Sequence, residues 1–96
     1  MAYYAVIYTY SDDASTQDEN RPAHRAYLAE LAEQGQLVAS GPLLGTRPAS
    51  ALLVFRADSE EQIRVLLAGD PFQQLGLVAQ TDVAEWNPVT EVFAQP

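Results

Sequence analysis

The chain has 96 residues and a mass of 10.5 kDa, which is the size of one small domain. It carries 13 acidic and 5 basic side chains, all of the latter arginine, for a formal net charge of −8. A chain so acidic, with no basic cluster, is a poor partner for nucleic acid or for an anionic membrane surface. It has no cysteine and one histidine, His24, which excludes a disulfide framework, a thiol nucleophile and a multi-histidine metal site within one chain.

The opening residues show no basic segment followed by a long apolar run, so we expect no secretory signal. No stretch approaches the ~20 apolar residues of a membrane-spanning helix. Together with the lack of cysteine, these features favour a cytoplasmic location. We therefore expect a single globular domain over residues 1–96.

The first third of the chain predicts a strand and a helix joined by a polar loop. Residues 3–10 are rich in β-branched and aromatic side chains, and both alternating faces are apolar, so this strand needs cover on both sides of its sheet. Residues 11–19 include four acids and are predicted to be a solvated loop. A helix is then expected from about Asn20 to about Gln34, with Pro22 in its first turn, where a missing N–H costs nothing.

The rest of the chain predicts three more strands and one more helix. They are a strand over residues 36–40, a strand over 51–57, a helix over 59–69 and a strand within 77–86. Gly41-Pro42 is predicted to end the first of these strands, and a turn-rich stretch follows it. Ser59 and Gln62 form a capping box at the start of the helix. No element is assigned to residues 89–96.

The resulting order, β-α-β-β-α-β, predicts a ferredoxin-like α+β fold. Its antiparallel sheet would have the strand order 4-1-3-2, with both helices on one face. The other face would be open, and the Tyr and Val side chains of the first strand would face water. A homodimer that packs sheet against sheet is the economical way to cover them.

Two polar residues occupy apolar positions of the predicted helices. His24 lies on the same helical stripe as Tyr27 and Leu31. Asp70 follows Ile63 by seven residues, where the apolar stripe of the second helix would continue. The topology places the start of the first helix, the end of the second and the Gly-Pro turn at one end of the helical layer. We therefore expect His24 and Asp70 to lie near each other.

A histidine beside a carboxylate suits proton transfer near neutral pH, because the carboxylate fixes the tautomer and stabilises the imidazolium. A purely structural role fits the same residues: His24 would pack at the helix start, and Asp70 would accept backbone N–H groups around Pro71. Arg21 and Arg25 lie near the same end and could attract a carboxylate, but surface charge is the favoured interpretation.

Five short motifs, in order along nearly the whole chain, resemble the YciI-like (YCII-related) family: Tyr8, His24-x-x-Tyr27-Leu28, Leu37 to Pro42, Asp70-Pro71-Phe72 and Val83-x-x-Trp86-Asn87-Pro88. Members of that family form dimeric α+β barrels of ferredoxin-like protomers and carry a His and an Asp in a pocket. One relative is a dehydrochlorinase of a chlorinated hydroxyquinol that uses neither a metal nor an organic cofactor.

The resemblance implies a homodimer with a small-molecule substrate or ligand, and no cofactor or metal. The site residues that it implies are His24 and Asp70 for catalysis, and Tyr8, Ser40, Gly41, Pro42 and Phe72 for substrate binding. The predicted function is acid–base chemistry of the elimination or hydrolysis type. Two alternatives stay open: a non-catalytic ligand-binding or regulatory module, and an interaction domain whose pocket is filled by side chains.

Overall fold

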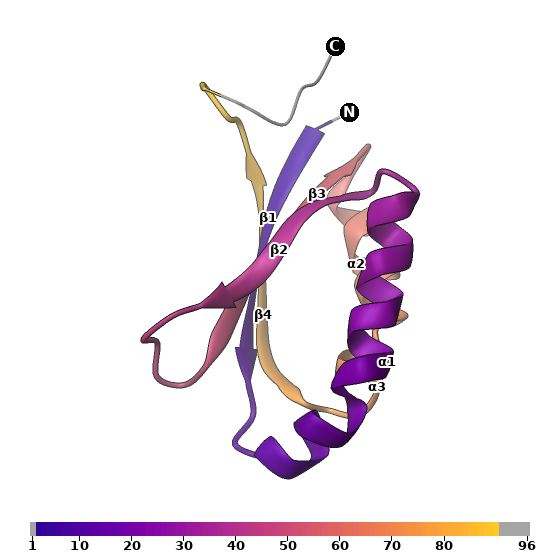
Figure 1. The fold of residues 1–96 in the computed structure, drawn as a ribbon. Coiled ribbons are helices and arrows are strands. Elements are labelled where there is room, and N and C mark those ends of the chain that lie inside the picture. Colours follow the sequence, from indigo (N-terminus) through magenta and orange to yellow (C-terminus); the bar gives the residue numbers. More distant parts are fainter. Residues whose placement is uncertain (1, 91–96) are drawn as a thin grey trace.

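The computed structural model describes residues 2–90, which form a four-stranded sheet with its helices on one face (Figure 1). In chain order the elements are β1 (Ala2–Tyr10), α1 (Ala14–Glu33), β2 (Leu37–Leu43), β3 (Ser50–Ala57), α2 (Glu60–Ala68), α3 (Pro71–Gln74) and β4 (Val78–Trp86). The sheet order is β2-β3-β1-β4 and each neighbouring pair is antiparallel, which confirms the predicted α+β class and topology. Among these residues, no helix is both long and apolar enough to cross a membrane.

The core lies between the helices and the sheet face that they cover. Tyr4, Val6 and Tyr8 of β1 point into this layer, where they are at most 6% exposed and pack around Phe55 of β3. The expectation that the Tyr and Val side chains of this strand face water is therefore wrong for these three residues. Since side chains alternate along a strand, Ile7 lies on the open face instead.

Helix α1 begins at Ala14, six residues before the predicted start. Asp13 is its N-cap, and the Asp13 carboxylate accepts a hydrogen bond from the Thr16 N–H at 3.2 Å. The prediction of a loop over residues 11–19 is therefore wrong for most of that segment, which forms the first turns of the helix.

Pro22 lies in the interior of α1 rather than in its first turn. A proline has no N–H to donate to the carbonyl one turn earlier, and helices bend at such positions. Figure 1 shows the first turns of α1 set at an angle to the rest of the helix. Gln17, in these turns, is buried and donates a hydrogen bond to the Ser11 carbonyl at 2.8 Å, which fastens this end of the helix to the segment after β1.

Strand β2 continues through Gly41 and Pro42 to Leu43, so the prediction that the Gly-Pro pair ends it is wrong. Pro42 lies opposite Ala51 of β3 in the antiparallel register. Because β2 is at the edge of the sheet, it tolerates a proline that a central strand would not.

The chain after α2 turns into a second short helix. Gly69 caps the end of α2, and Asp70 is the N-cap of α3, with Pro71 as the first helical residue. Asp70 therefore does not continue the stripe of α2. The direction of the Asp70 side chain is set by its position at the corner between α2 and α3.

Candidate functional site

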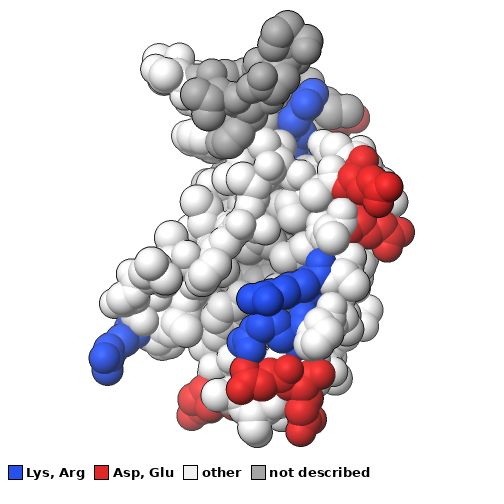
Figure 2. All heavy atoms as spheres, viewed as in Figure 1, with Lys and Arg blue, Asp and Glu red and all other residues white. Residues whose placement is uncertain are grey.

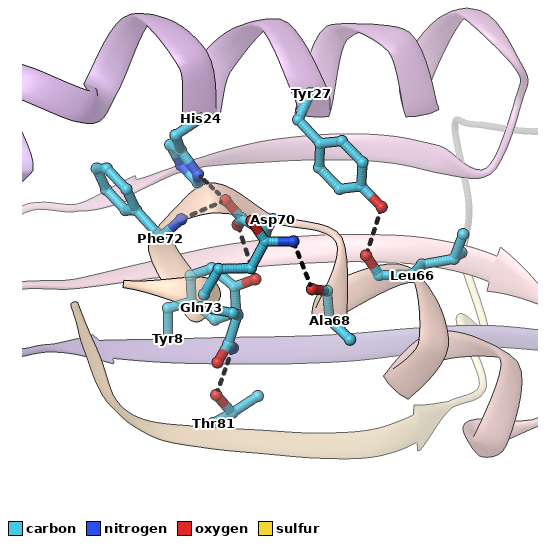
Figure 3. A network of polar contacts seen from close by, with 10 residues as sticks. Tyr8, His24, Tyr27, Leu66, Ala68, Asp70, Phe72, Gln73 and Thr81 are labelled. Carbon is cyan, nitrogen blue, oxygen red and sulfur yellow. Dashed lines mark hydrogen bonds and ion pairs between the residues drawn. The ribbon is translucent and has the colours of Figure 1, made fainter. Parts of the chain in front are cut away.

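The Asp70 carboxylate is fully buried and joins three elements (Figure 3). One oxygen, Oδ1, accepts a hydrogen bond from the Phe72 N–H at 3.0 Å and lies 2.8 Å from Nδ1 of His24. The other oxygen, Oδ2, accepts a hydrogen bond from the Tyr8 hydroxyl at 2.9 Å. Since an ionised carboxylate only accepts hydrogen bonds, Nδ1 of His24 is the donor, and the lone pair of the neutral imidazole is on Nε2.

His24 comes from α1, and its side chain is 9% exposed. Its ring stacks on Phe72, with the ring centroids 4.0 Å apart and the planes 5° from parallel. Within residues 2–90, no hydrogen bond reaches Nε2, and His24 is part of the wall of a cavity. Nε2 is therefore the atom that can exchange a proton with a bound molecule.

Two further hydrogen bonds hold the α2–α3 corner in place (Figure 3). The Tyr27 hydroxyl of α1 donates to the Leu66 carbonyl of α2 at 2.6 Å. The Gln73 amide of α3 donates to the Thr81 hydroxyl of β4 at 2.8 Å. The corner that carries the carboxylate is thus tied to α1 on one side and to the sheet on the other.

A cavity of about 310 Å³ lies beside His24, between α1, β2 and β3. Five of the residues that sequence reasoning placed at the site line it: His24, Ser40, Gly41, Pro42 and Phe72. The three from β2 form one wall, and the stacked pair of His24 and Phe72 forms another part of the lining.

The other two, Asp70 and Tyr8, do not line the cavity. Asp70 lies behind His24, and Tyr8 lies behind Asp70 with no exposed surface. Burial, followed by the negative charge of Asp70, holds the pKa of Tyr8 far above its ordinary value. Tyr8 therefore stays protonated and acts as a hydrogen-bond donor to the carboxylate, not as a contact for a ligand.

The structure adds lining residues that sequence reasoning did not assign to the site. Tyr10 lines the cavity and meets the Phe72 ring edge-on, with centroids 5.8 Å apart. Burial raises the pKa of Tyr10 and the charge of Asp70 adds to this, whereas Arg21 and Arg25 lower it. The sequence could have indicated Tyr10, because it follows Tyr8 by two residues and therefore lies on the same face of β1.

Arg21 and Arg25 also line the cavity, which favours the alternative that they attract a carboxylate over their interpretation as surface charge. Figure 2 shows arginine side chains gathered in the middle of this face, with acidic side chains below them. The spacing of three residues between Arg21 and His24 already placed Arg21 beside the histidine on the helix. No group of three or more metal-ligating His, Cys, Asp or Glu side chains occurs in the described part of the chain.

The comparisons with known proteins agree on the fold and the family. The sequence model of the YCII-related domain matches residues 1–87. A protein of Emericella nidulans, named derivative of benzaldehyde biosynthesis cluster protein C, is 33% identical over a match that covers 72% of this chain and 80% of that protein.

Among solved structures, 5-chloro-2-hydroxyhydroquinone dehydrochlorinase from Burkholderia phenoliruptrix, in complex with 2,5-dihydroxybenzoquinone, is similar with a TM-score of 0.77 and 25% identity. The match covers 88% of this chain and 93% of that one. An antibiotic biosynthesis monooxygenase has a TM-score of 0.58 and 13% identity over 94% of this chain and all of its own, which shows the shared fold alone. The fold is that of dimeric α+β barrel proteins, and with the buried pair it fits a small-molecule enzyme or ligand-binding protein.

Proposed function

We propose that this chain, which belongs to the YCII-related domain family, is an acid–base enzyme that acts on a small molecule bound beside His24. The 2.8 Å contact between His24 Nδ1 and Asp70 Oδ1, next to a cavity of about 310 Å³, carries the proposal. In it, Asp70 orients the imidazole and stabilises its protonated form, and Nε2 takes or returns a proton.

The reaction that we propose is proton abstraction with elimination. Nε2 of His24 takes a proton from an acidic position of the substrate. The electron pair of the broken bond forms a double bond, and the leaving group departs with its own bonding pair. The imidazolium then releases the proton to water. The likeness to a dehydrochlorinase supports elimination rather than hydrolysis.

The proposal includes a homodimer in the cytoplasm that packs the two open sheet faces together. Apolar side chains of β1 and β3, Ile7, Leu52 and Val54, lie on that face. Two large apolar side chains at the margins of the sheet, Leu43 and Trp86, are each 38% exposed. A second copy of the same face would cover this surface by self-complementary packing.

Release of chloride from 5-chloro-2-hydroxyhydroquinone tests the proposed chemistry. The wild-type protein should release chloride, and His24→Gln should lower the rate by about 10²–10⁴-fold, because it removes the proton acceptor. Asp70→Asn should lower the rate as well, and Glu61→Gln, an acid-to-amide exchange at an exposed position of α2, should leave it unchanged. Thermal unfolding of each variant separates lost chemistry from lost folding.

An unchanged rate in His24→Gln would overturn the role of this residue. Binding of the substrate without chloride release would instead favour the ligand-binding alternative, in which the pair only shapes the cavity.

A further inference from the structure

We propose that the cavity beside His24 binds small planar organic anions, and that the guanidinium groups of Arg25 and Arg21 hold the anionic group. This inference rests on the proposed function for the same site and names the class of its substrate.

The charge of the cavity differs in sign from that of the chain. The net charge of the chain is −8, yet two of its five arginines line this cavity and none of the lining residues is acidic. The carboxylate of Asp70 lies behind the imidazole, where its two oxygens already accept from Phe72 N–H, the Tyr8 hydroxyl and His24. A molecule in the cavity therefore meets positive groups first, and a cleft lined with one sign of charge concentrates ligands of the other.

The two arginines are placed to act together with the histidine. Arg21 lies three residues before His24 and four before Arg25 on α1, and all three side chains line the same cavity. A planar anion held by a guanidinium group would thus have its ring near Nε2. Arginine suits this task because its planar fork can donate two parallel hydrogen bonds to a carboxylate.

Both guanidinium groups can turn to a ligand. Arg25 makes no ion pair with any residue of the described part of the chain. Arg21 pairs with Asp18, whose side chain is 71% exposed, while that of Arg21 is 37% exposed. Exposed pairs of this kind contribute little, so a ligand anion can compete for Arg21 at small cost.

The other residues that line the cavity fit a ligand with a flat apolar ring. The stacked rings of His24 and Phe72, with Tyr10 edge-on to Phe72, give an aromatic surface, and Leu28 and Leu53 add aliphatic atoms. A volume of about 310 Å³ is at the low end of small-molecule sites, which favours a single substituted ring. As the proton leaves such a substrate, negative charge develops on its conjugated system, and the nearby guanidinium groups stabilise that charge.

Benzoate and its neutral isostere benzamide test the inference by isothermal titration calorimetry. Benzoate should bind at least about tenfold more tightly than benzamide, in line with a charge-assisted hydrogen bond. Arg25→Gln should weaken benzoate binding about tenfold, Arg21→Gln should weaken it less, and neither should change benzamide binding. Arg64→Gln is the matched control, because Arg64 also pairs with an acid on its own helix but lies outside this cavity. Added salt should reduce the preference for benzoate.

Three outcomes would each overturn the inference. They are equal affinities for benzoate and benzamide, an unchanged preference for benzoate in both Arg21→Gln and Arg25→Gln, and no binding of either probe at millimolar concentration. Because these are binding measurements, they do not depend on turnover. Chloride release that requires His24, without any preference for anions, would overturn only the substrate class. A preference for anions that depends on Arg25, without turnover, would overturn only the acid–base chemistry.

Discussion

The Tyr27 hydroxyl lies so close to the α-carbon of Gly69 that a Cβ atom built at position 69 would come within 2.3 Å of it. The φ angle of Gly69 is −82°, which any residue can adopt, so a glycine is needed here for space and not for its backbone freedom. The same hydroxyl donates to the Leu66 carbonyl at 2.6 Å. Helix α1 therefore reaches the end of α2 directly before the residue that carries the buried carboxylate.

Gly69→Ala should destabilise the protein by about 1–3 kcal/mol, since the added methyl group must displace the Tyr27 ring. The free energy of unfolding in urea measures this loss. Gly41→Ala is the matched control, because a Cβ at that position meets no atom within 4 Å. Tyr27→Phe removes the nearest atom, so the double variant should lose less than the sum of the two single losses. Wild-type stability in Gly69→Ala would show that the close approach is not required.

The buried hydroxyl of Tyr8 should make the protein unstable at alkaline pH. Burial and the charge of Asp70 keep the folded-state pKa of Tyr8 far above the ordinary value of 10.0. The unfolded chain loses this proton near pH 10 while the folded chain keeps it, so stability is complete below that pH and falls above it. The fall contributed by one tyrosine is about 1.4 kcal/mol per pH unit.

Tyr8→Phe should therefore reduce the slope of unfolding free energy against pH above about pH 10. At neutral pH the same variant should lose about 1–3 kcal/mol, because an oxygen of the buried carboxylate is left without a donor. Urea unfolding over a series of alkaline buffers gives both quantities. An unchanged alkaline slope would mean that Tyr8 ionises in the folded protein.

Because Asp13 caps the start of α1, we expect both low pH and substitution of Asp13 to loosen this end of the helix. Hydrogen bonds from Thr16 lower the pKa of Asp13, so the cap is intact above the ordinary carboxyl pKa of 3.8 and is lost as the pH falls through the lowered value. Asp13→Ala should speed hydrogen exchange at the Thr16 and Gln17 amides, whereas Asp12→Ala should not. Equal exchange rates in the two variants would contradict the role of Asp13 as the cap.

The proposed homodimer predicts a mass about twice 10.5 kDa in sedimentation equilibrium at micromolar concentration. Ile7→Lys places a charge in the middle of the open sheet face and should shift the protein toward monomer. Val65→Lys changes an apolar side chain on α2 that is 68% exposed, and it should leave the dimer intact. A monomer mass at every concentration would rule out the dimer.

The topology and the pairing of His24 with Asp70 were predictable from the sequence, because both follow from connectivity. Once the element order is known, the start of the first helix and the end of the second must share one end of the helical layer. The local reason given for Asp70 was wrong, however. Its side chain is aimed by the N-cap geometry of α3, a helix of four residues that is too short to leave a periodic pattern.

The errors in the sequence analysis have identifiable causes. Pro22 indicated a first turn, and tertiary packing of α1 overrode that preference for the start of the helix. Pro42 indicated a strand end, and the position of β2 at the sheet edge made it harmless. Whether Arg25 reaches the cavity depends on the distance between α1 and β2. The spacing of residues within one helix does not give that distance.

The residues behind the cavity and those that line it on β2 differ in how much substitution they tolerate. Asp70 and Tyr8 sit in the core, where a change of one atom leaves a buried polar group without a partner. Ser40 and Pro42, in contrast, are exposed residues of an edge strand, where exchanges alter stability little. Substitutions at residues 40–42 can therefore change the lining of the cavity while the buried contact between His24 and Asp70 stays intact. A search for a new ligand specificity should randomise these three residues first.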